Sequence, residues 1–185
     1  MIDEALAAIL DGQVVGIPTD TVYGIGVDPF NEDAVRRLFE LKGRPPNKPV
    51  GLLVAGFDQA ALITEINDEA SALAAEHWPG ALTLIVTPRV IMADWVGDQQ
   101  RRTIGIRVPD HPLARALLEQ SGPLAVTSAN ESGGPEAMND RQAREVFADR
   151  VAVYLEGTAP GGEASTVVDA TGAELVVLRR GPVEI

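Results

Sequence analysis

Glycine and proline interrupt this chain at short intervals along its whole length. The 185 residues include 18 glycines and 13 prolines, which end regular elements and start turns. Helices and strands must therefore be short, with many loops between them. The longest apolar runs fall far below the roughly 20 residues that a membrane-spanning helix needs.

The spacing of apolar residues between these interruptions predicts about five helices and seven or eight strands. The expected helices cover residues 2–10, 32–41, 67–78, 112–120 and 140–149. The expected strands cover residues 14–17, 50–54, 82–87, 103–108, 124–127, 151–155, 166–169 and 174–179. Near the C-terminus strands follow one another without a helix between them. We therefore expect an α/β (α+β) fold, a mixed sheet with helices packed on it.

Several classes of site are excluded by composition and by missing motifs. The chain has no cysteine, so disulfides, thiolate metal sites and a cysteine nucleophile are excluded. It carries neither a G-x-x-x-x-G-K-[ST] phosphate loop nor a G-x-G-x-x-G dinucleotide motif. His77 and His111 lack paired ligand spacing, and structural roles are expected for both. Acidic Asp3 and Glu4 stand where a signal peptide carries positive charge, which predicts a soluble protein of the reducing cytoplasm.

The charge of the chain is strongly acidic, but its two lysines are clustered. The formal net charge of −12 disfavours tight, nonspecific binding of nucleic acids, which depends on phosphate neutralisation. Lys42 and Lys48 flank Arg44 in a short proline-framed loop. Lys42 alone could complement the end of a helix. Three cations together favour an anion site, in which Arg44 offers a planar fork.

Three further segments place small polar or cationic side chains next to expected strand ends. Residues 18–26 hold two threonines, an aspartate and a tyrosine before glycines, and residues 127–134 hold hydroxyls and an amide. Either loop could be an ordinary turn or could cradle a phosphate with its backbone. Ser165 opens a C-terminal strand and Arg179 closes the last one. The alternation around Arg107 could direct its guanidinium away from the apolar face.

Together these loops resemble the YrdC-like threonylcarbamoyl-AMP synthases. The resemblance runs from about residue 6 to residue 183 and rests on residues 18–24 (PTDTVYG), Lys42-x-Arg44, Ser128-x-Asn130 and Arg179-x-Gly181. Residues 78–83 and 107–112 also look like family segments. Val50, where leucine is expected, and Glu131, inside the 128–130 loop, depart from the family pattern. The resemblance implies one synthase domain over residues 1–185, with a twisted mixed sheet around a deep concave cavity.

The family joins L-threonine, bicarbonate (or CO₂) and ATP into threonylcarbamoyl-AMP and pyrophosphate, for the t6A modification of tRNA. By resemblance, Lys42 and Arg44 are the catalytic residues, and Thr19 and Tyr23 line the threonine end. The ATP-binding residues implied are Lys42, Arg44, Arg107, Ser128, Asn130, Ser165 and Arg179. Mg²⁺ is expected to enter with ATP, since no carboxylate cluster is evident that would cage it. Other proteins would pass the carbamoyl group to tRNA, whose own binding would be weak or indirect.

Two other functions remain open at this point. Proteins of this family have been regarded as binders of structured RNA through a basic concavity, although the acidic net charge speaks against tight binding. Related domains of hydrogenase-maturation proteins use carbamoyl phosphate. Those proteins carry zinc-finger and acylphosphatase regions, which the sequence of residues 1–185 does not predict.

Overall fold

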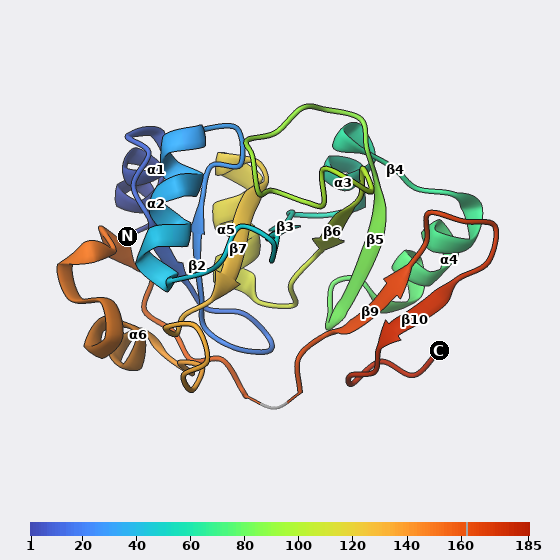
Figure 1. Ribbon diagram of the computed structural model, residues 1–185. Coiled ribbons are helices and arrows are strands. Elements are labelled where there is room, and N and C mark those ends of the chain that lie inside the picture. Colours follow the sequence, from blue (N-terminus) through green and yellow to red (C-terminus); the bar gives the residue numbers. More distant parts are fainter. Residues whose placement is uncertain (162) are drawn as a thin grey trace.

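One mixed β-sheet runs through the molecule and carries helices on both of its faces (Figure 1). The computed structural model describes residues 1–161 and 163–185. Its helices are α1 Ile2–Leu10, α2 Glu32–Lys42, α3 Phe57–Ile63, α4 Asp68–His77, α5 Pro112–Ser121 and α6 Asp140–Phe147, followed by a 3₁₀ turn over Ala148–Arg150. Its strands are β1 Val15–Ile17, β2 Gly24–Val27, β3 Gly51–Leu53, β4 Thr64–Glu65, β5 Leu82–Pro88, β6 Ile104–Arg107, β7 Leu124–Ser128, β8 Val153–Tyr154, β9 Thr166–Asp169 and β10 Val176–Arg179.

The sheet mixes parallel and antiparallel pairs, as the sequence predicts. Its order is β10-β9-β5-β6-β3-β7-β2-β1-β8, with β4 paired to β5. The pairs β1–β8, β3–β6 and β5–β9 are parallel, and the remaining pairs are antiparallel. The C-terminal strands β9 and β10 therefore form one edge, far in the sheet from the N-terminal strand β1 (Figure 1).

Helix ends are set by local sequence. The side chain of Asn31 accepts a hydrogen bond from the Ala34 N–H at 3.1 Å and so caps α2. Gly43 ends α2 with φ +63°, the left-handed conformation that glycine adopts without steric cost. Asn67 caps α4 in the same way as Asn31 caps α2. All five expected helices and eight expected strands are present, with boundaries shifted by a few residues.

The structure adds α3, β2 and β4 to the elements that the sequence predicts. β2 was expected to be part of a polar loop because two of its four residues, Gly24 and Gly26, are glycines. β2 forms because it lies between β1 and β7 and is hydrogen-bonded to both, which its own sequence does not suggest. α3 has only seven residues, too few for the helical period to be distinctive.

Two apolar clusters cover opposite faces of the central strands. Val15 and Ile17 of β1 pack with α1 and α5 in one cluster. Ile25 and Val27 of β2 belong to the other cluster, together with Leu38 of α2. This division follows from the alternation of side chains along each strand. α1 and α5 cover only part of the face that they pack against. The rest of that face carries loops and glycines, and the candidate site lies there.

A substitution at Gly51 tests how tightly the central strands are packed. An alanine Cβ there would lie 2.7 Å from the Gly105 carbonyl oxygen on β6, a contact that requires the strands to separate. We expect Gly51→Ala to lower the free energy of unfolding by about 1–3 kcal/mol, the usual cost of overpacking. Gly172→Ala, whose new Cβ would meet atoms only at ordinary contact distance, is the control. Equal urea midpoints for both variants would contradict this packing.

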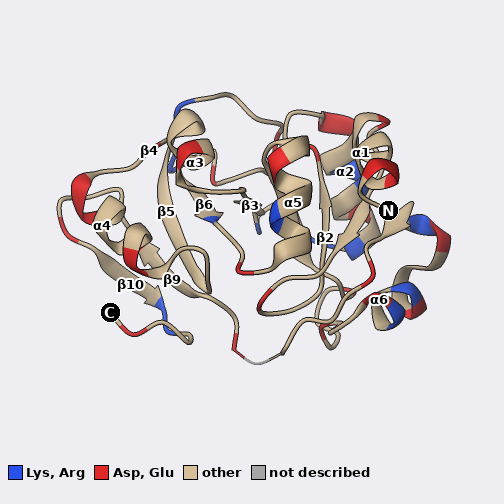
Figure 2. Cartoon of the chain, turned by 180° about the vertical axis from the view of Figure 1, so that it is seen from behind, with Lys and Arg blue, Asp and Glu red and all other residues tan. Residues whose placement is uncertain are grey.

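Acidic residues are spread over several helices and loops (Figure 2). Across residues 1–161 and 163–185, no helix has the length and apolar character needed to cross a membrane.

Candidate functional site

Neighbouring strands meet in a cavity of about 290 Å³ on the face that α1 and α5 leave open. Its floor includes Gly24 of β2, Gly51 of β3 and Gly105 of β6. These positions share one face because Gly24 is paired with Ser128, and Gly51 with Val126, on β7. Without side chains, the three glycines leave room above the sheet for a ligand. Polar side chains from several separate segments surround this floor.

The first wall comes from the loop that follows β1. Thr19 and Thr21 are both buried and line the cavity. Their hydroxyls lie 3.1 Å apart, and the Thr19 hydroxyl also donates to the Val22 carbonyl at 2.7 Å. These contacts fold the loop on itself, so the same hydroxyls both stabilise the turn and line the cavity.

Arg107 forms the adjoining wall at the end of β6. Ile104 and Ile106 on the same strand enter the core, while Arg107 lines the cavity, as its alternation suggested. Nε donates to the Gly80 carbonyl at 3.0 Å and Nη1 to the Thr21 hydroxyl at 3.0 Å. Nη2 forms an ion pair with Asp20. Burial lowers the pKa of Arg107 from its ordinary value, and Asp20 opposes this shift.

A third wall joins the sheet edge to the loop before β9. Both Nε and Nη2 of Arg179 donate to the Ser165 carbonyl, at 3.0 and 2.8 Å. The Ser165 hydroxyl lies 2.8 Å from the Thr83 hydroxyl on β5. All three residues line the cavity, and they place a guanidinium next to two hydroxyls.

Lys42 organises the loop after β7. Its ammonium is buried and donates to the Asn130 Oδ1 at 2.7 Å and the Ser128 carbonyl at 2.7 Å. The Ser128 hydroxyl in turn donates to Asn130 Oδ1 at 2.8 Å. Burial, and secondarily the nearby Arg44 charge, lower the pKa of Lys42 to about 8, against a smaller opposing effect of Glu136. Lys42 and Asn130 are therefore in direct contact, as a convergent site requires.

The guanidinium of Arg44 closes the proline-framed loop on itself and reaches the end of β7. It donates to the carbonyls of Lys48 and Pro49, at 2.5 and 2.9 Å, and reaches the Thr127 hydroxyl at 3.5 Å. Thr127 itself lines the cavity. Burial lowers the pKa of Arg44 from its ordinary value. Arg44 and Lys42 thus border the cavity from behind Thr127 and Ser128 and are not part of its wall.

The structure corrects the placement expected for Tyr23. This side chain is completely buried in the core, and its hydroxyl donates to the Leu155 carbonyl at 2.7 Å. Because the hydroxyl is committed to that bond on the core side of the loop, Tyr23 does not line the threonine end of the cavity. It anchors the loop from beneath, where its pKa is raised by burial.

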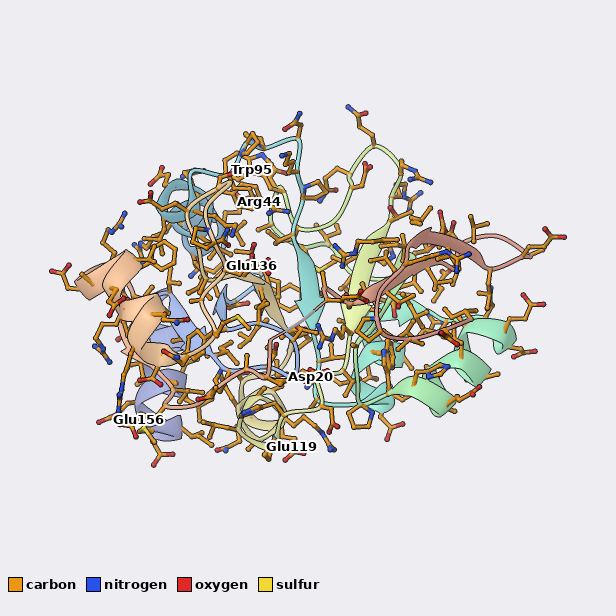
Figure 3. The ribbon with its side chains drawn as sticks, turned by 90° about the horizontal axis from the view of Figure 1, so that it is seen from below. Asp20, Arg44, Trp95, Glu119, Glu136 and Glu156 are labelled. Carbon is orange, nitrogen blue, oxygen red and sulfur yellow. The ribbon has the colours of Figure 1, made fainter. Side chains whose placement is uncertain are left out.

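Of the site residues expected from sequence, the cavity wall contains Thr19, Arg107, Ser128, Ser165 and Arg179. Asn130 lies behind Ser128, with its amide nitrogen donating to the Gly134 carbonyl at 2.7 Å. Sequence reasoning missed Thr83 and Glu136, which also line the cavity. In the view of Figure 3, Glu136 lies between Arg44 and Asp20. Glu136 carries no sequence signal, since a lone glutamate after a glycine-rich loop reads as a solvated side chain.

Comparison with known proteins relates this arrangement to one family. The model of the Sua5_yciO_yrdC family, described as "Telomere recombination", matches residues 7–181. A Vibrio parahaemolyticus protein named threonylcarbamoyl-AMP synthase is 35% identical, over 97% of this chain and 98% of its own length.

Solved structures agree with this relation. The crystal structure of Pyrococcus abyssi Sua5 complexed with L-threonine superimposes with a TM-score of 0.90 at 37% identity, covering 97% of this chain and 54% of that one. The structure of Escherichia coli YciO gives a TM-score of 0.89 at 26% identity, covering 99% of this chain and 90% of that one.

Proposed function

Because this chain belongs to the Sua5/YciO/YrdC family, we propose that its cavity makes threonylcarbamoyl-AMP and pyrophosphate from L-threonine, bicarbonate or CO₂, and ATP. The observation that carries this proposal is the convergence of hydroxyls and guanidinium groups from several segments on one glycine-floored cavity. A carbamate oxygen of N-carboxylated threonine must attack the α-phosphorus of ATP, with pyrophosphate as the leaving group, and both reactants are anions. A site for this reaction has to supply cations and N–H donors that offset their repulsion.

The two ends of the cavity suit different substrates. Thr19 and Thr21 lie beside Arg107, so these residues form a small pocket for an amino acid. We therefore place Arg107 at the threonine carboxylate, although the sequence suggested a role toward ATP. Ser128 and Arg179, with Ser165, would bind the nucleotide. Lys42 and Arg44 would fix the 128–130 and 44–49 loops and contribute positive charge toward the phosphates.

Mg²⁺ fits this site as a companion of ATP. No group of three or more potential metal-binding side chains occurs in residues 1–161 and 163–185, so a protein-caged metal is not indicated there. Mg²⁺ commonly uses one or two carboxylates together with substrate phosphates, and Glu136 supplies one carboxylate on the cavity wall. Glu136 would hold the ion, which would neutralise phosphate charge.

We expect Glu136→Gln to raise the Mg²⁺ concentration needed for half-maximal rate on the order of tenfold, the scale of losses when groups that support a metal are changed. Free Mg²⁺ is titrated at constant ATP. Glu119→Gln, on α5 at a distance from Glu136 in Figure 3, serves as the control. An unchanged Mg²⁺ requirement in Glu136→Gln would remove this residue from the metal site.

The lowered pKa of Lys42 predicts a basic limit to substrate capture. Its ammonium form donates to the 128–130 loop, and that form is lost as pH rises through about 8. We expect kcat/KM for ATP, which reports the free enzyme, to fall over that range. Lys42→Arg keeps its charge over this pH range, so its kcat/KM should not fall there. A wild-type profile that stays level to pH 9 would contradict the assignment.

Pyrophosphate release tests the function directly. The rate is measured with ATP, threonine and bicarbonate together, and with threonine and bicarbonate each omitted in turn. Synthesis of threonylcarbamoyl-AMP requires dependence on both. Release supported by carbamoyl phosphate in place of bicarbonate would favour the carbamoyl-transfer alternative, and submicromolar tRNA affinity without substrates would favour an RNA-binding module.

We propose further that residues 1–185 act as one YrdC-like domain in the cytoplasm. Other proteins would receive the intermediate and modify tRNA, and tRNA binding by this chain itself would be weak or indirect. The acidic net charge supports the last point, because phosphate neutralisation needs excess Lys and Arg.

A further inference from the structure

Asp20 is a largely buried carboxylate next to the cavity that the proposed reaction has not yet used. Its side chain is 15% exposed, and Oδ1 accepts a hydrogen bond from Arg107 Nη2 at 2.5 Å. The same oxygen accepts the backbone N–H of Asp110 at 3.0 Å. Asp20 thereby ties the loop after β1 to the turn after β6. It is not part of the cavity wall, so any effect on a ligand must pass through a neighbour.

Arg107 is that neighbour, and its contacts leave part of it free. A guanidinium carries five N–H donors. Each of its three nitrogens uses one N–H in a hydrogen bond: Nε to Gly80, Nη1 to Thr21 and Nη2 to Asp20. One N–H therefore remains on each terminal nitrogen of a side chain that faces the cavity. Two donors held in one plane match the two oxygens of a carboxylate.

We propose that Asp20 is a positioning residue that orients Arg107 toward the carboxylate of the amino-acid substrate. The proposal rests on the proposed function for the identity of that substrate. Asp20 supplies the only charged partner of Arg107 in the described part of the chain. Without the charge of Asp20, the other acceptors of the guanidinium are the neutral Gly80 carbonyl and Thr21 hydroxyl. Hydrogen bonds to neutral acceptors fix the orientation of the guanidinium plane less strongly than a bond to a carboxylate.

The Asp20→Asn variant removes the charge of this side chain but keeps the hydrogen bond that stabilises the turn. Asparagine can still accept the Asp110 N–H, but it cannot form the ion pair. We expect the KM for threonine to rise on the order of 10- to 100-fold, the scale of a misplaced binding group. The KM for ATP and the kcat at saturating threonine should change much less. Equal losses for threonine and ATP, or an unchanged threonine KM, would overturn the proposal.

A double-mutant cycle separates positioning from general stabilisation. If Asp20 acts through Arg107, then adding Asp20→Asn to Arg107→Gln should raise the threonine KM no further, because interacting residues are not additive. Independent, multiplying effects would assign Asp20 a merely structural role. Asp28→Asn is the control, since the Asp28 carboxylate also accepts a backbone N–H in a turn, that of Phe30 at 2.9 Å.

A measurement without substrate keeps this inference distinct from the proposed function. NMR of the arginine side chains reports how fast the Arg107 guanidinium rotates about its Cζ–Nε bond. Rotation should be slower in the wild type than in Asp20→Asn, whatever reaction the cavity performs. Equal rotation rates would refute positioning, whereas wild-type protein that needs no threonine for pyrophosphate release would refute only the function. Should Asp20→Asn not fold, Asp20→Glu retains the charge and should retain slow rotation.

Discussion

Replacing Lys42 by methionine is expected to reduce pyrophosphate release on the order of 10²- to 10³-fold, the effect of removing a preorganised electrostatic group. Methionine is of similar length, but it cannot donate to Ser128 or Asn130, which Lys42 holds at 2.7 Å. Four oxygen atoms of Ser128 and Asn130 would then lose a buried partner. The loop would no longer present Ser128 to the cavity in one fixed geometry.

The measurement is single-turnover pyrophosphate release with all three substrates. Arg36→Met provides the control, because it also removes one cation but from an exposed ion pair with Asp33, and such surface pairs contribute little. Circular dichroism of Lys42→Met establishes that the sheet has formed. A folded Lys42→Met protein with a rate within a few-fold of the wild type would exclude an essential role for Lys42.

Arg44→Lys is expected to lower turnover on the order of 10²-fold, although it keeps the positive charge. The guanidinium of Arg44 reaches three acceptors in different directions: the carbonyls of Lys48 and Pro49 and the Thr127 hydroxyl. A lysine ammonium is a single point of charge on a flexible stem and cannot reproduce that fork. The 44–49 loop would then lose the bonds that close it and its contact with Thr127 at the end of β7.

Arg89→Lys serves as the matched control for this change, because the Arg89 side chain is exposed and reaches a single carbonyl, that of Ala61, at 3.5 Å. Rates are compared at saturating ATP and threonine, so that a change in binding alone does not produce the effect. Near-normal turnover in Arg44→Lys would show that charge at this position is sufficient and that the fork is not needed.

Local sequence determined the five expected helices, to within a few residues at their ends, but not α3. The Asn31 cap and the Gly43 stop act within a few residues, and the same local logic applies to Asn67 at α4. Residue spacing also predicted that Arg107 faces away from Ile104 and Ile106, since alternation along a strand is a local property. The four polar segments were recognisable because their residue types are unusual for plain turns.

Tertiary structure alone decided what each polar residue does. Tyr23 lies within the loop that sequence assigned to threonine, yet its hydroxyl bonds to Leu155, 132 positions away. Lys42 was expected to bind ATP, and the structure places it behind Ser128, outside the cavity wall. Glu136 and Thr83 reach the cavity only because β5, β7 and their loops meet around it. The order of the strands in the sheet determines which segments become neighbours. That order depends on contacts between residues far apart in the chain, which a local sequence pattern does not reveal.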